Sequence, residues 1–183
     1  MRKLWILGGK STFLTRILQI NYRFMLTERE NKFLERAIEL SRQGMKSGQG
    51  GPFGCVVAMG DEIVGEGCNM VTSSNDPTAH AEVVAIRKAC EKLGTYQLTG
   101  CEIYTSCEPC PMCLGAIYWA RPQKVVYANT KEEAAAIEFD DDFIYHEIYS
   151  KMSDRKIPFI HQTHPMAQQI FEEWKQWEGK TKY

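Results

Sequence analysis

Residues 76–113 contain the side chains best suited to bind a metal ion and move protons. One end of this stretch carries His80 and Glu82, and the other carries Cys107, Cys110 and Cys113 in the run Cys-Glu-Pro-Cys-Pro-Met-Cys. Catalytic zinc typically has three protein ligands and keeps its fourth tetrahedral position for water, whereas structural zinc has four protein ligands. Because His80, Cys110 and Cys113 supply three ligands, the spacing predicts a catalytic zinc site.

Glu82 is the candidate proton carrier of this site. It stands two residues after His80, where a carboxylate can lie beside the metal without being a ligand. Zinc lowers the pKa of its bound water, so hydroxide becomes available near neutral pH, and Glu82 can take the released proton and deliver it to a leaving group. A His-x-Glu motif followed by Pro-Cys-x-x-Cys is the known signature of zinc deaminases that act on nucleobases.

Three other interpretations fit parts of the motif. The spacing of Cys107, Cys110 and Cys113 resembles part of a ferredoxin iron–sulfur run, although the position due for the fourth cysteine is Ile117. Cys107 could instead complete the zinc site as a fourth ligand, which would make the zinc structural. The His-x-Glu pair could also merely cap a surface helix. We favour the catalytic zinc site over these three.

Composition indicates a single globular domain that acts on a small molecule. The chain has 183 residues, of which 44% are hydrophobic and 25% are charged. Residues 1–24 carry five basic residues and no acid, which leaves 17 basic and 23 acidic residues, a net charge of −6, in the remainder. Nucleic-acid binding depends on Lys and Arg that neutralise phosphates, so an acidic body favours a small neutral substrate.

Cysteine usage and hydropathy indicate the compartment. Seven cysteines, an odd number with three at metal-like spacing, favour a reducing cytoplasm over a disulfide framework. No run of 18 or more apolar residues is present, so no membrane span is predicted. The basic residues 1–24 include only a short apolar run and no cleavage-like site, so we expect an N-terminal extension or leader before a single domain at 25–183.

The elements that must position the site follow from hydrophobic periodicity and turn signals. Thr27 and Glu30 match a capping box that begins the first helix. The expected elements, in chain order, are a helix at about 28–46, strands at 53–59 and 62–71, a helix from about 80 to 93, a strand at 102–106, a helix at 111–120, a strand at 124–128 and a C-terminal helical pattern through 166–177. Their alternation predicts an α/β layered domain, and the initial hairpin makes its sheet mixed.

Both halves of the metal motif fall at helix starts. His80 and Glu82 precede an apolar face of helical spacing, and Pro111 directly after Cys110 suits the first turn of another helix. A helix N-terminus lowers the pKa of a thiol there, and a thiol must be deprotonated to bind zinc. Two helix N-termini are therefore expected to converge on one cation.

From Gly50 to about Phe143 the sequence resembles the cytidine-deaminase-like superfamily and, within it, the bacterial guanine deaminases. The resemblance rests on Gly51-Pro52-Phe53-Gly54, Asn75-Asp76-Pro77-Thr78-Ala79-His80-Ala81-Glu82, Tyr104-Thr105-Ser106-Cys107-Glu108-Pro109-Cys110-Pro111-Met112-Cys113 and Ala116-Ile117-Tyr118-Trp119-Ala120-Arg121. It continues through Phe139-Asp140-Asp141 and covers nearly all of the chain after Met25. The resemblance implies a three-layer α/β/α sandwich with a mixed five-stranded sheet, one zinc ion per subunit and Glu82 as proton shuttle.

The resemblance also implies a guanine pocket. Phe53 would stack on the purine, Asn69 would hydrogen-bond the ring edge, and the backbone at Ala81 would add a contact. Asp141 would bind the imidazole or amide side of guanine and assist proton transfer, and Trp119 would line the cavity. In a homodimer with a swapped C-terminal segment, the site would be closed by the partner's terminal tyrosine, at position 183.

Each pocket residue also has a simpler role open to it. Phe53 could belong to the core, Asn69 to a turn, and Asp141 to a solvated acidic run. Trp119 could be a packing residue, and Tyr183 could belong to an idle tail, because terminal residues commonly fray.

The hypothesis from sequence is hydrolytic deamination of guanine to xanthine and ammonia. Zinc-bound hydroxide attacks the carbon that bears the amine, and Glu82 passes the proton to the ring nitrogen and then to the departing nitrogen. tRNA adenosine deaminases share both motifs but need a surface that holds RNA, and the acidic residues at 138–142 argue against one. A non-catalytic, zinc-stabilised interaction module is the third possibility, and it requires Cys107 as a ligand.

Overall fold

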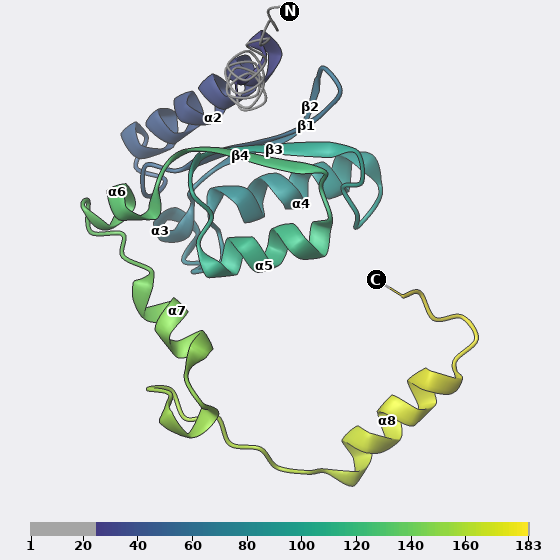
Figure 1. Ribbon diagram of the computed structural model, residues 1–183. Helices are drawn as coiled ribbons and strands as arrows, with labels where there is room; N and C mark the ends of the chain where they lie inside the picture. The colour runs from purple at the N-terminus through teal and green to yellow at the C-terminus, as the bar shows by residue number, and fades with distance from the viewer. Residues whose placement is uncertain (1–24, 183) are drawn as a thin grey trace, which may run out of the picture.

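A four-stranded mixed sheet lies at the centre of the computed structural model, which describes residues 25–182 (Figure 1). The strands are β1 (Gly54–Met59), β2 (Glu62–Cys68), β3 (Cys101–Cys107) and β4 (Lys124–Asn129), in the spatial order β2-β1-β3-β4. β1 is antiparallel to both β2 and β3, whereas β3 and β4 are parallel. The four strands and the mixed sheet expected from periodicity are confirmed. The extension expected at 1–24 and the terminal Tyr183 lie outside the described residues.

The five-stranded sheet implied by the resemblance is wrong: residues 25–182 contribute four strands to it. After β4 the chain turns into helix α6 (Lys131–Ala135), because Thr130 and Glu133 form a reciprocal capping box that starts a helix there. Helix α7 (Asp142–Tyr149) follows. β4 therefore remains an edge strand.

The second strand is also shorter than its apolar pattern predicts. β2 ends at Cys68, and the short helix α3 (Val71–Ser74) follows. The side-chain Oδ1 of Asn69 accepts a hydrogen bond from the Val71 backbone N–H at 3.2 Å. Such an Asx-type turn competes with the extended conformation and ends the strand.

Helices cover both faces of the sheet, which gives the three layers expected (Figure 1). Helix α2 (Glu28–Lys46) packs on one face, where Phe33 lies against Tyr104 with ring centroids 5.3 Å apart. Helices α4 (Ala81–Leu93) and α5 (Pro111–Ala120) lie on the other face. α4 packs closely on β2 at Gly65, where an added Cβ would lie only 2.8 Å from the Cβ of Ala89.

A polar cluster joins α2 to the sheet on the face away from α4 and α5. The Glu102 carboxylate is buried and accepts hydrogen bonds from Tyr104 at 2.6 Å and from Arg29 at 2.5 Å. Lys124 Nζ lies 3.1 Å from Glu102 and also pairs with Glu30. Burial alone raises the pKa of Glu102, but the three donors outweigh it and lower this pKa to about 2.

We expect Glu102→Gln to destabilise the fold in a pH-dependent way. A carboxylate whose pKa is lowered by folding stabilises the protein above its unfolded pKa of about 4.3, and this contribution disappears as pH falls toward 2. With allowance for solvent screening it is worth about 2 kcal/mol. Urea unfolding at pH 7 should therefore show E102Q less stable than wild type by about that amount, with the difference shrinking from pH 5 to pH 2.5.

The matched control for E102Q is Glu28→Gln, which neutralises an exposed carboxylate on α2 and should change the unfolding free energy by less than about 0.5 kcal/mol. A stability difference between E102Q and wild type that stays constant from pH 7 to pH 2.5 would contradict the role given to the Glu102 charge.

The C-terminal part of the chain extends from the body as an arm, residues 142–182 (Figure 1). It contains α7, a short 3-10 helix (Met152–Asp154) and helix α8 (Pro165–Gln176). The arm returns toward the body at its end, where Tyr96 donates a hydrogen bond to the Lys182 carbonyl at 3.4 Å. None of the helices within residues 25–182 has the length and apolarity of a membrane span.

Candidate active site

His80, Cys110 and Cys113 come together beside the sheet and offer three ligand atoms within 4.8 Å of one another. The Nδ1 of His80 lies 3.5 Å from the Sγ of Cys110 and 3.5 Å from that of Cys113. Tetrahedral zinc, with Zn–N of about 2.0–2.1 Å and Zn–S of about 2.3 Å, places nitrogen and sulfur ligands about 3.5 Å apart. The donor set therefore fits a zinc ion in both chemistry and spacing.

Two helix N-termini supply the ligands, as the sequence predicts. His80 is the N-cap residue of α4, and Cys110 is the N-cap residue of α5, with Pro111 at its first helical position. Neither N-cap side chain makes a capping hydrogen bond to its own helix, so both are available to a metal. Cys113 reaches the same point from the first turn of α5.

The groups around Cys110 lower its pKa and so favour the thiolate, the form that binds a metal ion. The pKa of Cys110 is lowered to about 4, first by a hydrogen bond from the Cys113 thiol and then by His80, against the opposing effect of burial. The pKa of Cys113 is raised, because its proton is shared with Cys110 and because it is buried. The hydrogen bond to Cys110 raises the pKa of His80 in turn.

Cys107 does not join this group. Its Sγ donates to the Thr130 carbonyl at 3.6 Å, on the side of the chain that leads into α6, and the side chain is buried. Burial, followed by the charge of Glu82, raises its pKa to about 11, which disfavours a thiolate ligand. The geometry thus supports neither a four-ligand structural zinc nor an iron–sulfur cluster, whose fourth position is occupied by Ile117 in the apolar core.

Glu82 lies beside the metal ligands with only 6% of its surface exposed. Its Oε2 is 3.3 Å from the Sγ of Cys113, and its Oε1 accepts a hydrogen bond from the Thr105 hydroxyl at 3.2 Å. The pKa of Glu82 is raised, chiefly by burial. A raised pKa favours the protonated form of the carboxyl, which suits a group that accepts and delivers a proton.

Phe53 and Asn69 form a second group, held together by backbone contacts. The N–H of Asn69 donates to the Phe53 carbonyl at 2.9 Å. The Oδ1 of Asn69 accepts from the N–H groups of Gly51 at 3.3 Å and Val71 at 3.2 Å, which fixes the orientation of the amide. With its oxygen engaged, Asn69 has its NH₂ group to offer as a donor. A side chain at Gly50 would collide with Asn69 Oδ1, so glycine is required there.

Phe139 is a residue of this group to which the sequence assigned no role. Its ring meets Phe53 edge-on, with centroids 4.9 Å apart and an interplanar angle of 89°. A Cβ at Gly51 would lie 2.8 Å from the Phe139 ring, so the loop before β1 packs directly against it. An aromatic side chain next to an acidic run was the one available signal.

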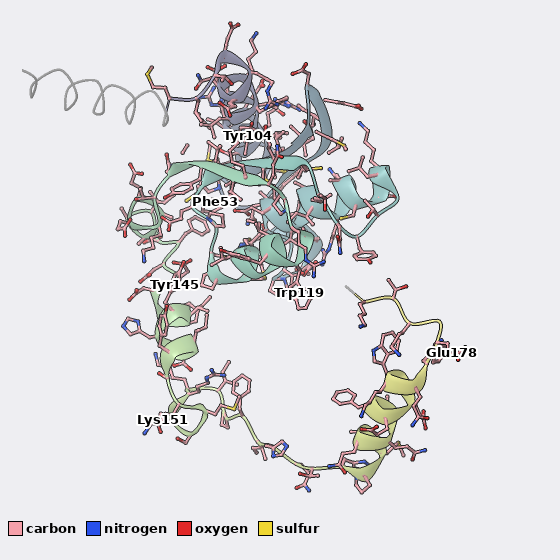
Figure 2. The ribbon with its side chains drawn as sticks, turned by 45° about the vertical axis from the view of Figure 1, so that its right-hand side comes forward. Phe53, Tyr104, Trp119, Tyr145, Lys151 and Glu178 are labelled. Atoms are coloured by element: carbon pink, nitrogen blue, oxygen red, sulfur yellow. The ribbon has the colours of Figure 1, made fainter. Side chains whose placement is uncertain are left out.

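The other candidates lie at different distances from the ligands. Asp141 is partly buried, and its charge helps to raise the pKa of His80, so it lies within electrostatic reach of the metal site. Ala81 is fully buried at the first position of α4. Trp119 is 63% exposed toward the end of α5 and lies well apart from Phe53 (Figure 2). The structure therefore brings Trp119 into neither group, and its role in a pocket stays a prediction.

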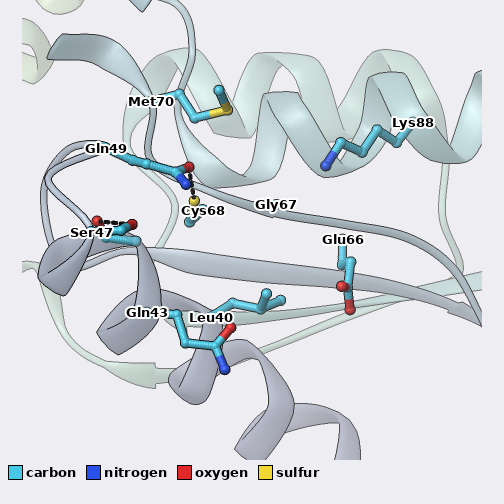
Figure 3. A pocket seen from close by; sticks show the side chains of 10 residues that line it. Leu40, Gln43, Ser47, Gln49, Glu66, Gly67, Cys68, Met70 and Lys88 are labelled. Atoms are coloured by element: carbon cyan, nitrogen blue, oxygen red, sulfur yellow. Dashed lines mark hydrogen bonds between the residues drawn. The ribbon is translucent and has the colours of Figure 1, made fainter. Parts of the chain in front are cut away.

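A cavity of about 230 Å³ lies between α2, β2 and α4, away from the metal ligands (Figure 3). It is lined by Leu40, Gln43, Gly44, Ser47, Gln49, Glu66, Gly67, Cys68, Met70 and Lys88. Cys68 donates to the side chain of Gln49 at 3.0 Å within it. None of the predicted site residues is part of its lining.

Comparison with known proteins agrees with the geometry. Residues 27–129 match the family described as "Cytidine and deoxycytidylate deaminase zinc-binding region". Guanine deaminase of Bacillus subtilis is 54% identical over 151 residues, covering 82% of this chain and 97% of that protein. Its crystal structure superimposes with a TM-score of 0.82 at 52% identity and covers 86% of this chain and 99% of that one.

More distant relatives include both a guanine deaminase and a tRNA-specific adenosine deaminase. The structure of guanine deaminase from Nitrosomonas europaea has a TM-score of 0.58 at 28% identity, over 77% of this chain and 79% of that one. A tRNA-specific adenosine deaminase of Aquifex aeolicus is 38% identical over 96 residues, 52% of this chain and 63% of that protein. The expected resemblance to bacterial guanine deaminases is thus confirmed, and the chain belongs to the zinc-dependent cytidine and deoxycytidylate deaminase family.

Proposed function

We propose that this protein hydrolyses guanine to xanthine and ammonia. The observation that carries the proposal is the buried Glu82 carboxylate, 3.3 Å from one thiol of a three-ligand zinc site. Three ligands leave a tetrahedral position for water, as catalytic zinc requires. The choice of guanine is supported by 54% identity to a guanine deaminase along 97% of its length.

The residues of this chain have distinct tasks in the reaction. His80, Cys110 and Cys113 would hold the zinc ion, which would supply a Lewis acid that makes water acidic enough to lose a proton near neutral pH. Glu82 accepts that proton through Oε2, the oxygen on the ligand side. As the water oxygen bonds to C2 of guanine, Glu82 protonates the adjacent ring nitrogen. Glu82 then takes the remaining proton from the hydroxyl now attached to C2 and delivers it to the exocyclic nitrogen; the C2 carbonyl forms as the bond from C2 to that nitrogen breaks and ammonia leaves.

The second group of residues suits recognition of a purine base. Phe53 offers a ring face to the base, and Phe139 holds that ring in place from its edge. The NH₂ group of Asn69 can donate to an acceptor on the ring edge, and the Asp141 carboxylate can accept from a ring N–H. The backbone of Ala81, the side chain of Trp119 and, across the dimer, the partner's Tyr183 complete the proposed pocket.

An ammonia-release screen tests this function. Zinc-loaded protein is assayed with guanine, adenine, cytosine, cytidine, guanosine, aminotriazines and tRNA, and we expect the highest kcat/KM for guanine. A preference for tRNA would overturn the proposal in favour of an adenosine deaminase, and no release from any compound would favour a non-catalytic zinc module.

The seven cysteines, all free, suit a cytoplasmic setting for the reaction.

We also propose a homodimer in which the arm packs on the partner. Helix α8 exposes the apolar residues Ile170, Phe171 and Trp174. Helix α5 exposes a second apolar set, Leu114, Tyr118 and Trp119. Exposed apolar surface on this scale is typical of interaction sites. Analytical ultracentrifugation of the full chain checks the assembly, and a monomer at micromolar concentration would contradict it.

A further inference from the structure

Thr105 has a hydroxyl group in the apolar interior, at the back of the proposed catalytic carboxylate. It lies near the carboxyl end of the central strand β3 and is 1% exposed. Its Oγ1 is 3.2 Å from Oε1 of Glu82 and 3.4 Å from the Gly54 carbonyl on β1. The two preceding residues on the same face of β3, Cys101 and Ile103, are fully buried members of the apolar core.

Packing alone does not call for a hydroxyl at this position. Valine has nearly the shape of threonine, favours β-strands equally and has no polar atom to desolvate. A buried hydroxyl is favourable only where it is hydrogen-bonded, and Thr105 finds its side-chain acceptor in Glu82. The identity of this residue is therefore explained by the carboxylate and not by the core.

The contact distinguishes the two oxygens of Glu82. Oε1 is held from the sheet side by Thr105, while Oε2 faces Cys113 and the metal ligands at 3.3 Å. A glutamate side chain at the first turn of a helix has several rotamers, and one hydrogen bond to a rigid strand selects among them. Because a hydroxyl both donates and accepts, Thr105 keeps this contact whether or not the carboxyl carries a proton.

We infer that Thr105 is a positioning residue for the reaction, which fixes Glu82 so that Oε2 is the oxygen that exchanges protons with water and substrate. This inference rests on the proposed guanine deamination. The side-chain hydrogen bonds of Thr105 go to Glu82 and to the Gly54 carbonyl, and neither partner is a metal ligand. Thr105 therefore acts through Glu82 on the chemical step, and guanine binding should change little. Misplacement of a catalytic group by about 1 Å typically costs on the order of 100-fold in rate.

The test compares Thr105→Val with Thr105→Ser in zinc-loaded enzyme. We expect T105V to lower kcat for guanine by about 10- to 100-fold with KM changed less than about 3-fold. T105S keeps the hydroxyl and should restore kcat to within about 3-fold of wild type. Zinc content, measured by plasma mass spectrometry, should be the same in all three proteins.

Ile103→Val is the matched control, because Ile103 lies two residues earlier on the same face of β3 and has no polar side-chain atom that could hydrogen-bond Glu82. It removes buried volume from the same layer and should leave kcat unchanged even where its melting temperature falls. The inference is overturned if T105V retains the wild-type kcat, or if T105S is as slow as T105V. If the wild-type protein does not deaminate guanine, the proposed function fails. If the wild type is active and T105V is slow, the result supports the positioning role of Thr105.

Discussion

Glu82→Gln should lower kcat for guanine deamination by about 10²- to 10⁴-fold, the range that general acid–base catalysis contributes. Glutamine keeps the size of the side chain and can still meet the Thr105 hydroxyl, but it cannot accept or deliver a proton. Because the ligand atoms belong to His80, Cys110 and Cys113, the zinc content should stay at that of wild type. Steady-state ammonia release together with metal analysis measures both quantities on one preparation.

The control for this variant is Glu91→Gln, which makes the same chemical change at an exposed position on the same helix. It should leave both rate and zinc content unchanged. A zinc-loaded E82Q protein that releases ammonia at the wild-type rate would show that another group carries the proton. Loss of zinc from E82Q would instead place the Glu82 carboxylate among the ligands.

Cys113→Ser and Cys107→Ser should differ strongly in zinc affinity and in deamination rate, although both remove a buried thiol from the same short segment. C113S loses one of three ligands, so we expect zinc affinity to fall by about 100-fold or more and deamination to fall with it. C107S replaces the thiol that donates to the Thr130 carbonyl with a hydroxyl that can still donate there, so it should keep its zinc and at least about a third of the wild-type kcat.

Competition with a chromogenic chelator gives the zinc affinities, and X-ray absorption at the zinc edge of the wild-type protein gives the number of bound sulfurs. Two sulfurs are expected, from Cys110 and Cys113. Three sulfurs, or weak zinc binding by C107S, would favour the structural zinc site of an interaction module. Thermal unfolding with and without added zinc shows whether C107S is simply less stable, since a stability effect persists at saturating metal.

Local patterns predicted the metal site because each half of it is short. His80 with Glu82, and Cys110 with Cys113, are within four residues of each other, and each pair lies at the start of a helix that apolar spacing or a proline signal predicts. The four strands were equally accessible, because each is a short segment with apolar residues that is bounded by turn or helix signals. The fifth strand came from resemblance and not from a run in this sequence, and the capping box at Thr130 shows why the chain is helical there.

The residues that sequence did not identify act through tertiary contacts. Thr105 reaches Glu82 only because β3 lies beside β1 and beneath α4, and nothing in the local pattern marks its hydroxyl. Phe139 meets Phe53 across a long sequence separation. Asn69 was predicted as a base contact with a turn as the alternative, and the side-chain hydrogen bonds that make it the turn at the end of β2 are visible only in the structure.

The sheet order has a consequence for the way the protein acquires its metal. β1 and β2 are adjacent in sequence and can pair early, whereas β3 must close a long loop before it can pair with β1 on the other side. His80 lies in the loop between β2 and β3, and the thiols of Cys110 and Cys113 follow β3. A complete ligand set therefore exists only after the central strand has docked. Zinc then stabilises the finished topology by mass action and gives no advantage to a chain in which β3 is misplaced.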